Sequence, residues 1–309
     1  MYTKKIAIII CVLFAGLFSC EEYEDYLVDY KFSAVYFATQ KPLRTVVAYD
    51  QMQFKVGVAL AGKRENSTDE WARYSIDATL LTDPAIVGTN TFTLLPTDYY
   101  DISDETMMVV PEGEFIGDVT ITLDHDAFTS DPLAHQNTYA LPLRIVEASV
   151  DSVLSGDYDE EGNQLVAPKD YTIVVVKYIS PLHGVYYHKG VERELDGSGA
   201  VVSETEYNVK DLSKNATWNL TTLGLDTVQT SGAGTSNNEL KLTRNADNSV
   251  TVEAAATAIT VLEGDGTYNE EKREFYLDYK YAKGGTEYSV TDTLILRQAP
   301  EKDLRFEEW

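Results

Sequence analysis

Apolar and polar residues alternate one for one along most of the chain after residue 32, and this pattern constrains the fold more than any other feature. Successive side chains of a β-strand point to opposite faces, so strict alternation predicts strands with one buried face. No segment shows a convincing amphipathic helical period. We therefore expect an all-β protein.

The first group of predicted strands spans residues 32–179. Its seven members are 33–39, 51–60, 74–80, 106–110, 118–123, 138–146 and 171–178. Short strands at this density are typical of an immunoglobulin-like β-sandwich. The stretch 152–168 is predicted to be an acidic hairpin loop. Asp157 and Asp159 resemble the start of a calcium loop, but Pro168 stands where a bidentate glutamate is needed, so we predict no metal.

A second group of strands follows Pro181, which marks the predicted domain boundary. These strands begin near residues 184, 200, 216, 239, 249, 257, 273 and 286, and turns rich in Gly, Asn and Asp connect them. Eight sequential antiparallel strands can close into a barrel, which removes exposed strand edges. We therefore predict a sandwich domain at 32–179 and an antiparallel β-barrel domain at 180–309.

The first residues predict export and lipid attachment. Lys4 and Lys5 precede an uncharged apolar run, 6–18, which is shorter than the ~20 residues that a membrane-spanning helix needs. The run ends at Leu17-Phe18-Ser19-Cys20, which resembles the bacterial lipobox. We predict a signal peptide at 1–19, lipidation of Cys20 and an acidic tether at 20–31. The alternative is an ordinary secretory signal with a chance cysteine.

Charge and cysteine content exclude several classes of protein. The only cysteines are Cys11 and Cys20, so the mature chain is predicted to form no internal disulfide. The net charge of -25 repels nucleic acid and anionic head groups, so only the acyl chains are expected to hold the protein to a membrane. An acidic cluster at residues 21–25 resembles the signal that sends Bacteroidetes lipoproteins to the outer face of the outer membrane. The alternative is a solvated tether.

No catalytic, metal or cofactor motif stands out. The chain has no Gly-x-Ser-x-Gly elbow, phosphate loop or dinucleotide fingerprint. His125 lies between two aspartates, but no second histidine lies at zinc spacing. A glycosidase needs only two placed carboxylates, and none can be selected among 50 acidic residues. We therefore predict a protein that is not an enzyme and needs no cofactor.

Aromatic residues are the better indication of a binding site, because tyrosine and tryptophan stack on the C–H faces of sugar rings. The chain has 21 Tyr, 10 Phe and 3 Trp. Trp71 is the best candidate, since it lies in a polar stretch predicted to be a loop. Tyr158 in the acidic loop is a second. Trp218 is a third, although it shares its strand phase with Leu220 and is expected to be mostly core.

An ordered set of motifs resembles a known family. The motifs are Val35-Tyr36-Phe37-Ala38-Thr39, the segment 94–100, Val109-Val110-Pro111-Glu112-Gly113, the segment 139–145 and Gly184-Val185-Tyr186-Tyr187-His188. Together they resemble Bacteroidetes surface lipoproteins of polysaccharide-utilisation loci. These proteins have an N-terminal domain also found ahead of family-18 endoglycosidases and a lipocalin-like C-terminal domain.

The resemblance implies a non-catalytic cell-surface accessory of a SusC/SusD-type importer, with a polysaccharide or oligosaccharide as ligand. The resemblance does not identify any binding residue in this sequence. The alternatives are a surface adhesin or fimbria-like assembly subunit, and a divergent glycoside hydrolase. Three segments that start at Asp151, Asp226 and Asp292 also resemble the Bacteroidetes O-glycosylation sequon.

Overall fold

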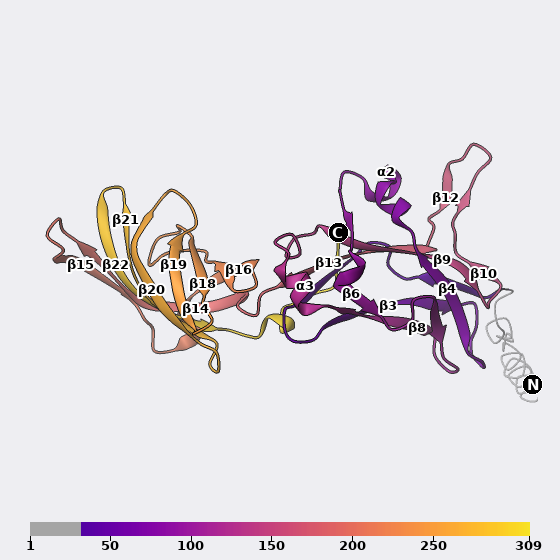
Figure 1. The fold of residues 1–309 in the computed structure, drawn as a ribbon, viewed down its shortest axis with the longest axis horizontal. Coiled ribbons are helices and arrows are strands. Elements are labelled where there is room, and N and C mark those ends of the chain that lie inside the picture. Colours follow the sequence, from indigo (N-terminus) through magenta and orange to yellow (C-terminus); the bar gives the residue numbers. More distant parts are fainter. Residues whose placement is uncertain (1–31) are drawn as a thin grey trace, which may run out of the picture.

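The computed structural model describes residues 32–309, which form two β-domains placed end to end (Figure 1). The predictions for residues 1–31, including lipidation of Cys20, lie outside the described residues. No helix in the described part of the chain is long and apolar enough to cross a membrane. The prediction of an all-β protein with a sandwich and then a barrel is confirmed.

The first domain is a sandwich of two sheets. One sheet has the order β10 (Ser152–Val153), β1 (Ala34–Phe37), β3 (Met52–Ala61), β8 (Ile116–Leu123) and β6 (Tyr100–Ile102). The other has the order β23 (Glu307–Glu308), β2 (Pro42–Val47), β13 (Tyr171–Ile179), β9 (Tyr139–Ala148), β4 (Glu70–Ile76) and β7 (Met107–Val110), with β5 (Thr93–Leu94) paired to β9. A separate hairpin, β11 (Asp157–Tyr158) and β12 (Gln164–Val166), fills the predicted acidic loop.

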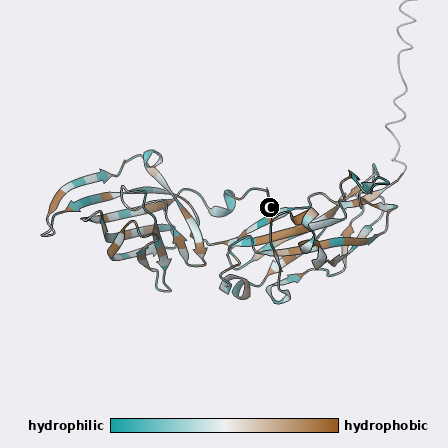
Figure 2. Cartoon of the chain, turned by 90° about the horizontal axis from the view of Figure 1, so that it is seen from above, coloured by the Kyte–Doolittle hydropathy of each residue, from teal (hydrophilic) through white to brown (hydrophobic). Residues whose placement is uncertain are grey.

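The second sheet of the sandwich is covered on both faces. Its inner face packs on the first sheet around side chains such as Phe37, Ile121 and Leu141. Its outer face carries a smaller apolar cluster that includes Leu80 and Ile173. Burial on both faces explains why β13 is a continuous apolar run rather than an alternating one. Figure 2 shows this difference as long brown stretches in the sandwich and shorter, interrupted ones in the barrel.

The predicted strand 74–80 is only partly correct. β4 ends at Ile76, and the Asp77 side chain accepts a hydrogen bond from the Thr79 N–H to begin a 3-10 helix, η3 (Ala78–Thr82). Asp83 then caps α2 (Pro84–Val87) in the same way. The other short helices are η4 (Thr97–Tyr99), α3 (His125–Ser130), η5 (Leu212–Lys214) and η6 (Pro300–Lys302). Local capping by aspartate therefore overrides the alternating pattern at this point.

The second domain is a closed antiparallel barrel of eight strands. They are β14 (Gly184–Leu195), β16 (Ala216–Gly224), β17 (Thr227–Gln229), β18 (Leu240–Arg244), β19 (Ser249–Ala254), β20 (Thr260–Asn269), β21 (Glu274–Lys283) and β22 (Thr286–Leu296). Pairing of β14 with β22 closes the ring. β15 (Val201–Tyr207), predicted as a barrel strand, pairs only with β14 and lies outside the ring. The three-residue β17 was missed because it is too short to alternate.

The chain passes between the two domains twice. On the way out, the Ser180 N–H donates to Thr222 Oγ1 at 2.9 Å and Ser180 Oγ donates to the Leu225 carbonyl at 2.6 Å. On return, β23 pairs with β2 and Trp309 Nε1 donates to the Ile173 carbonyl at 2.7 Å. The last residues thus join a sandwich sheet, although we placed 180–309 in the barrel domain. Figure 1 shows the C-terminus beside β13.

Candidate functional site

The three aromatic residues selected from the sequence lie in separate places. Trp71 is on β4, paired with Val109, and not in a loop; its ring lies 5.6 Å from the Arg73 guanidinium. Trp218 is 7% exposed inside the barrel and stacks on His188 with 3.7 Å between ring centroids. Tyr158 is exposed on the β11–β12 hairpin, where it borders a cavity of about 420 Å³. The structure does not bring these residues together in one site.

The barrel interior contains a buried aspartate that the sequence did not indicate. Asp292 is 1% exposed and lies on the inward face of β22 between Val290 and Leu294. Its Oδ1 accepts from the Tyr207 hydroxyl at 2.6 Å and lies 2.9 Å from His188 Nε2. Its Oδ2 accepts from the Tyr279 hydroxyl at 2.7 Å. These bonds compensate the desolvation of the carboxylate.

A second buried carboxylate joins the barrel wall to the loop between β17 and β18. Glu192 on β14 accepts from the Tyr281 hydroxyl at 2.8 Å and from the Thr235 N–H at 3.1 Å. In the same loop, the Gly234 N–H donates to the Tyr279 hydroxyl at 2.7 Å. A Cβ on Gly234, which has φ +54, would come 2.1 Å from Glu192 Oε2. The loop therefore lies directly against this carboxylate.

This hydrogen-bond network stabilises the barrel core rather than forming an open ligand site. Burial, followed by the charge of Asp292, raises the pKa of Tyr279 well above its usual value of 10.0, so its hydroxyl stays a donor. Both carboxylates are occupied by protein donors. In the sequon resemblance at Asp292-Thr293-Leu294, the aspartate is a buried core residue, which explains that match structurally.

The arrangement best suited to a ligand is a cleft of about 460 Å³ between the two domains, here called the junction cleft. The sandwich contributes Ala48, Tyr49, Asp50 and His125, the linker contributes Pro181, and the barrel contributes Leu225, Arg244, Tyr268, Glu270 and Arg273. Ligand sites commonly have volumes of roughly 300–1,000 Å³ and often form between domains. The junction cleft has this size and this position.

Tyr49 and Arg273 form the centre of the junction cleft. Tyr49 is 38% exposed, and its hydroxyl donates to Glu301 Oε2 at 3.0 Å. The Arg273 guanidinium lines the cleft with Tyr49 and Tyr268, and its Nη2 donates to the Pro181 carbonyl at 2.7 Å. Burial raises the pKa of both tyrosines, so their hydroxyls remain protonated at neutral pH. The Tyr49 ring is thus held in place through its hydrogen bond to Glu301.

The backbone of Arg273 supports a specific role for its side chain. Arg273 has φ +57, in the left-handed region where glycine is favoured, at the end of the turn between β20 and β21. A residue with a Cβ costs roughly 1–2 kcal/mol in that conformation. The side chain offsets this cost by linking the barrel to the Pro181 carbonyl of the linker, beside Tyr49 in the cleft.

Charged groups complete the wall of the cleft. The Arg244 guanidinium lies 5.7 Å from the Tyr268 ring centroid and forms an ion pair with Asp226 at 2.5 Å. Asp50 and Glu270 line the cleft from opposite domains. The side chain of Asp124, beside His125, caps α3 through the Ala127 N–H. No group of three or more His, Cys, Asp or Glu side chains in residues 32–309 is placed to hold a metal.

No sequence signal marks the junction cleft, because its residues come from six separate segments. Tyr49 and Asp50 follow β2, and Arg273 ends a turn that is more than 200 residues away along the chain. Neither Tyr49 nor Arg273 interrupts an alternating pattern of apolar and polar residues. The only unusual feature at the cleft is the positive backbone φ of Arg273, and this angle is visible only in the structure and not in the sequence.

Comparison with known proteins finds two family models that match separate parts of the chain. Residues 29–152 match a family model described as an N-terminal domain, and residues 184–295 match a second model described as a C-terminal domain. No curated protein has a significantly matching sequence.

Three solved structures show how far the similarity extends. A Bacteroides ovatus protein of unknown function aligns over 87% of this chain and 95% of its own, with 20% identity and a TM-score of 0.71. A second B. ovatus protein, described as a proposed carbohydrate-binding protein, aligns over 84% of this chain and 79% of its own, with 15% identity and a TM-score of 0.32.

The third is the Bacteroides endoglycosidase EndoBT-3987, solved with a Man5GlcNAc product. It aligns over 44% of this chain and 28% of its own, with 17% identity and a TM-score of 0.29. The last two alignments are too distant to bear on function. The chain therefore shares its fold, a β-sandwich followed by a β-barrel, with a Bacteroides ovatus protein of unknown function.

Proposed function

We propose that this chain is a non-catalytic glycan-binding protein, anchored through lipid on Cys20 to the outer face of the outer membrane, and that it serves a SusC/SusD-type polysaccharide importer. The junction cleft is the observation that carries the binding proposal. It combines a half-exposed tyrosine with arginine and carboxylate side chains in a cavity of suitable size.

The chemistry of the cleft suits a sugar. The Tyr49 ring offers an apolar face for the C–H side of a pyranose, while Asp50 and Glu270 offer acceptors for hydroxyl groups. Such sites stay wet, so the affinity for each sugar is expected to be weak. Many copies on one cell surface would then gain avidity on a polymer that spans several of them.

Binding rather than cleavage fits the arrangement of the carboxylates. The buried pair in the barrel, Glu192 and Asp292, is saturated by tyrosine, histidine, threonine and backbone donors. Asp50 and Glu270 are the carboxylates that reach the junction cleft. We assign them to hydroxyl recognition, and the assay below separates this role from acid–base catalysis.

The test is a glycan array followed by calorimetry on the purified protein. Tyr49→Ala should weaken binding of a glycan found on the array by about tenfold, equivalent to ~1.4 kcal/mol, because the stacking face is lost. Tyr49→Phe keeps the ring and should retain most of the affinity. Tyr158→Ala, an exposed tyrosine beside another cavity, is the matched control and should bind normally.

Other outcomes would favour the alternatives. Release of shortened glycans would identify a hydrolase, and specific binding to a protein with no glycan binding would identify an adhesin. The anchor is tested separately with Cys20→Ala, which should leave the protein outside the membrane fraction. Removal of the native protein by protease added to intact cells would support surface exposure.

A further inference from the structure

A second cleft between the two domains lies beside the returning C-terminal segment. This segment, residues 297–309, runs from the end of β22 back to β2 and is here called the strap (yellow between the domains in Figure 1). At the barrel, the Arg297 N–H donates to the Val185 carbonyl at 2.9 Å. At the sandwich, the Trp309 N–H donates to the Lys41 carbonyl at 3.0 Å. Between these two ties the strap borders a cavity of about 410 Å³, which we call the strap crevice.

The charges that line the strap crevice balance one another. The sandwich contributes Lys177, the linker contributes His183, and the strap contributes Asp303, Arg305 and Glu307. This set holds two cations, two carboxylates and one imidazole. An uncharged ligand therefore suits the strap crevice better than an ion does, because neither sign of charge prevails there.

Two of these charged groups lack a partner within the chain. Asp303 Oδ1 accepts from the Gln298 side-chain amide, whereas Asp303 Oδ2 is buried and has no hydrogen-bond partner in residues 32–309. The ammonium group of Lys177, on a half-buried side chain, has neither an ion pair nor a hydrogen bond within the same residues. Buried polar groups normally have partners, and an unpaired one is costly. A carboxylate oxygen and an ammonium group are thus both free to bind a ligand.

His183 adds an uncharged donor. Its Nδ1 accepts from the Thr222 N–H at 3.2 Å, which fixes the proton of the neutral ring on Nε2. Burial, followed by the charge of Lys177, lowers the pKa of His183, so the ring is neutral at pH 7. The strap crevice therefore offers a neutral N–H donor, a cationic donor and a carboxylate acceptor.

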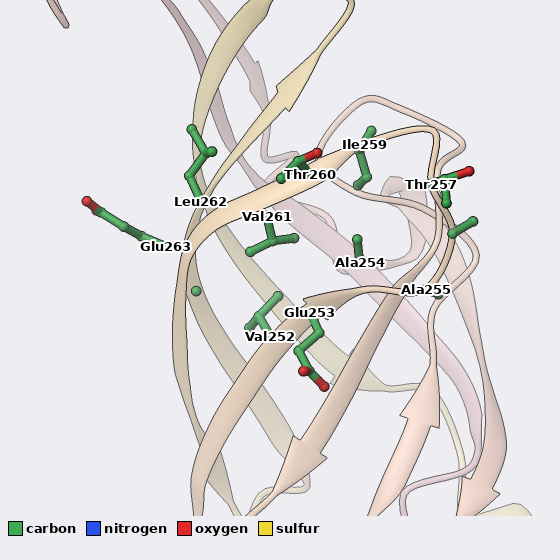
Figure 3. A pocket seen from close by; sticks show the side chains of 12 residues that line it. Val252, Glu253, Ala254, Ala255, Thr257, Ile259, Thr260, Val261, Leu262 and Glu263 are labelled. Atoms are coloured by element: carbon green, nitrogen blue, oxygen red, sulfur yellow. The ribbon is translucent and has the colours of Figure 1, made fainter.

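The strap crevice differs in this respect from the hollow in the barrel wall. That hollow, of about 660 Å³ between β19 and β20, is lined mainly by small aliphatic side chains (Figure 3). Its two carboxylates are already paired, Glu253 with Lys241 at 2.6 Å and Glu263 with Lys280 at 2.8 Å. Volume alone does not distinguish a binding site, and the free polar groups lie in the strap crevice.

The strap crevice and the junction cleft share two walls. In the linker, Pro181 lines the junction cleft and His183 lines the strap crevice. In η6, Pro300 lines the strap crevice, while Glu301 accepts from the hydroxyl of Tyr49 in the junction cleft at 3.0 Å. Residues two apart in a chain are separated by at most roughly 7 Å. An oligosaccharide of a few linked sugars therefore spans from one cleft to the other.

We propose that the strap crevice is a second sugar-binding site, which forms one bipartite site with the junction cleft for an uncharged oligosaccharide. This inference rests on the glycan-binding function proposed above. A hydroxyl group donates one hydrogen bond and accepts two. One sugar hydroxyl in the strap crevice can thus donate to Asp303 Oδ2 and accept from Lys177 and from His183 Nε2. Residues 303–306 belong to no strand, so a small movement there admits the hydroxyl to the buried oxygen.

Calorimetry with a neutral hexasaccharide of a glycan found on the array tests the bipartite site. One hexasaccharide should bind per chain, and Lys177→Met and Asp303→Asn should each weaken binding at least tenfold. Asp303→Asn keeps the acceptor for Gln298 and removes an uncompensated buried charge, so the melting temperature should not fall. A purely structural role for Asp303 would predict the reverse. Lys55→Met, on the other sheet of the sandwich, is the matched control and should bind as the native chain does.

The histidine side chains give a second measurement on the native chain, which does not depend on how the variants fold. The hexasaccharide should shift the imidazole NMR signals of His125 in the junction cleft and of His183 in the strap crevice. The signal of His188, which is 4% exposed inside the barrel, should stay constant and serves as the internal reference.

Several results would overturn the bipartite site. They are a shift of His125 without one of His183, unchanged affinity in both variants, two hexasaccharides bound per chain, and tighter binding of a polyuronate than of the neutral chain of equal length. The first of these leaves glycan binding at the junction cleft intact. Absence of binding by every glycan would instead remove the proposed function, and this inference with it.

Discussion

The two domains fill their interiors with different chemistry. The sandwich core is mainly aliphatic and phenylalanine side chains, and its buried Tyr74 and Tyr178 donate to backbone carbonyls. The barrel core instead contains Tyr279 and Tyr281, whose hydroxyls donate to Asp292 and Glu192. A closed ring turns the inward residues of all its strands towards one axis, so polar groups placed there can find partners on other strands. The sandwich is thus stabilised mainly by apolar packing, whereas the barrel is also stabilised by buried hydrogen bonds to carboxylates.

The same small motif occurs in both domains but at different depth. In the sandwich, Asp131 accepts from the hydroxyls of Tyr99 and Tyr139, and both Asp131 and Tyr99 are partly exposed. In the barrel, Asp292 accepts from Tyr207 and Tyr279 in the core. The comparison teaches that burial, and not the number of bonds, determines what such a motif contributes, because an unpaired group is costly only where water cannot replace the partner.

The largest expected effect comes from breaking the buried motif. Asp292→Ala should destabilise the barrel by about 3–5 kcal/mol, because it removes the partner of the buried His188 and Tyr279 and of the partly buried Tyr207. Asp131→Ala should cost the sandwich only about 1 kcal/mol, since Asp131 and Tyr99 are partly exposed and water can enter where the carboxylate is removed. Hydrogen exchange of β14 and β22, compared with β9 and β13, measures the two domains separately. Equal losses in the two variants would remove the distinction that we draw from burial.

A smaller effect should separate the domains at the returning C-terminus. Trp309 packs edge-on against Phe92 with 4.7 Å between ring centroids and lies 4.9 Å from the Lys41 ammonium. Trp309→Ala should cost the sandwich about 2 kcal/mol through lost apolar burial. Exchange should speed up in β2 and β13 and stay constant in β21. Faster exchange in β21 would mean that the last residues stabilise both domains together.

The smallest effect is expected from alkaline pH. Burial raises the folded-state pKa of Tyr207, Tyr279 and Tyr281 above 10.0, and nearby carboxylates raise it further. A raised folded-state value gives stability that is complete below the unfolded pKa and is lost as pH rises beyond it. Burial also raises the pKa of Tyr74 and Tyr178 in the sandwich, so both domains should lose stability above pH 10.0. The barrel should lose it first, because Tyr279 and Tyr281 donate to buried carboxylates, whereas Tyr74 and Tyr178 donate to backbone carbonyls. Tyrosinate absorbance together with exchange in β21 and β13 checks the order of unfolding.

Much of the fold could be predicted because alternation is a local property. Phe275, Leu277, Tyr279 and Tyr281 share one face in the sequence, and all four are at most 1% exposed in the barrel. Trp218 is buried for the same reason. The prediction was wrong where a local hydrogen bond competes, as at Asp77, and where a strand is too short to alternate, as in β17.

The candidate site could not be predicted in the same way. Trp71 was assigned to a loop because its neighbours are polar, yet β4 begins one residue before it. Tyr49 and Arg273 are unremarkable in the sequence and meet only because the barrel docks against the sandwich. Asp292 looked like part of a surface sequon, since its partner His188 lies 104 residues earlier.

By itself, the sequence determined which side of each strand is buried, because a side chain's face depends only on its position within its own strand. It also determined the acidic character of the chain. Tertiary structure alone decided that β15 lies outside the ring and that Tyr49 and Arg273 line one cleft. These outcomes depend on pairing between distant segments, and a local pattern carries no information about which distant partner it will meet.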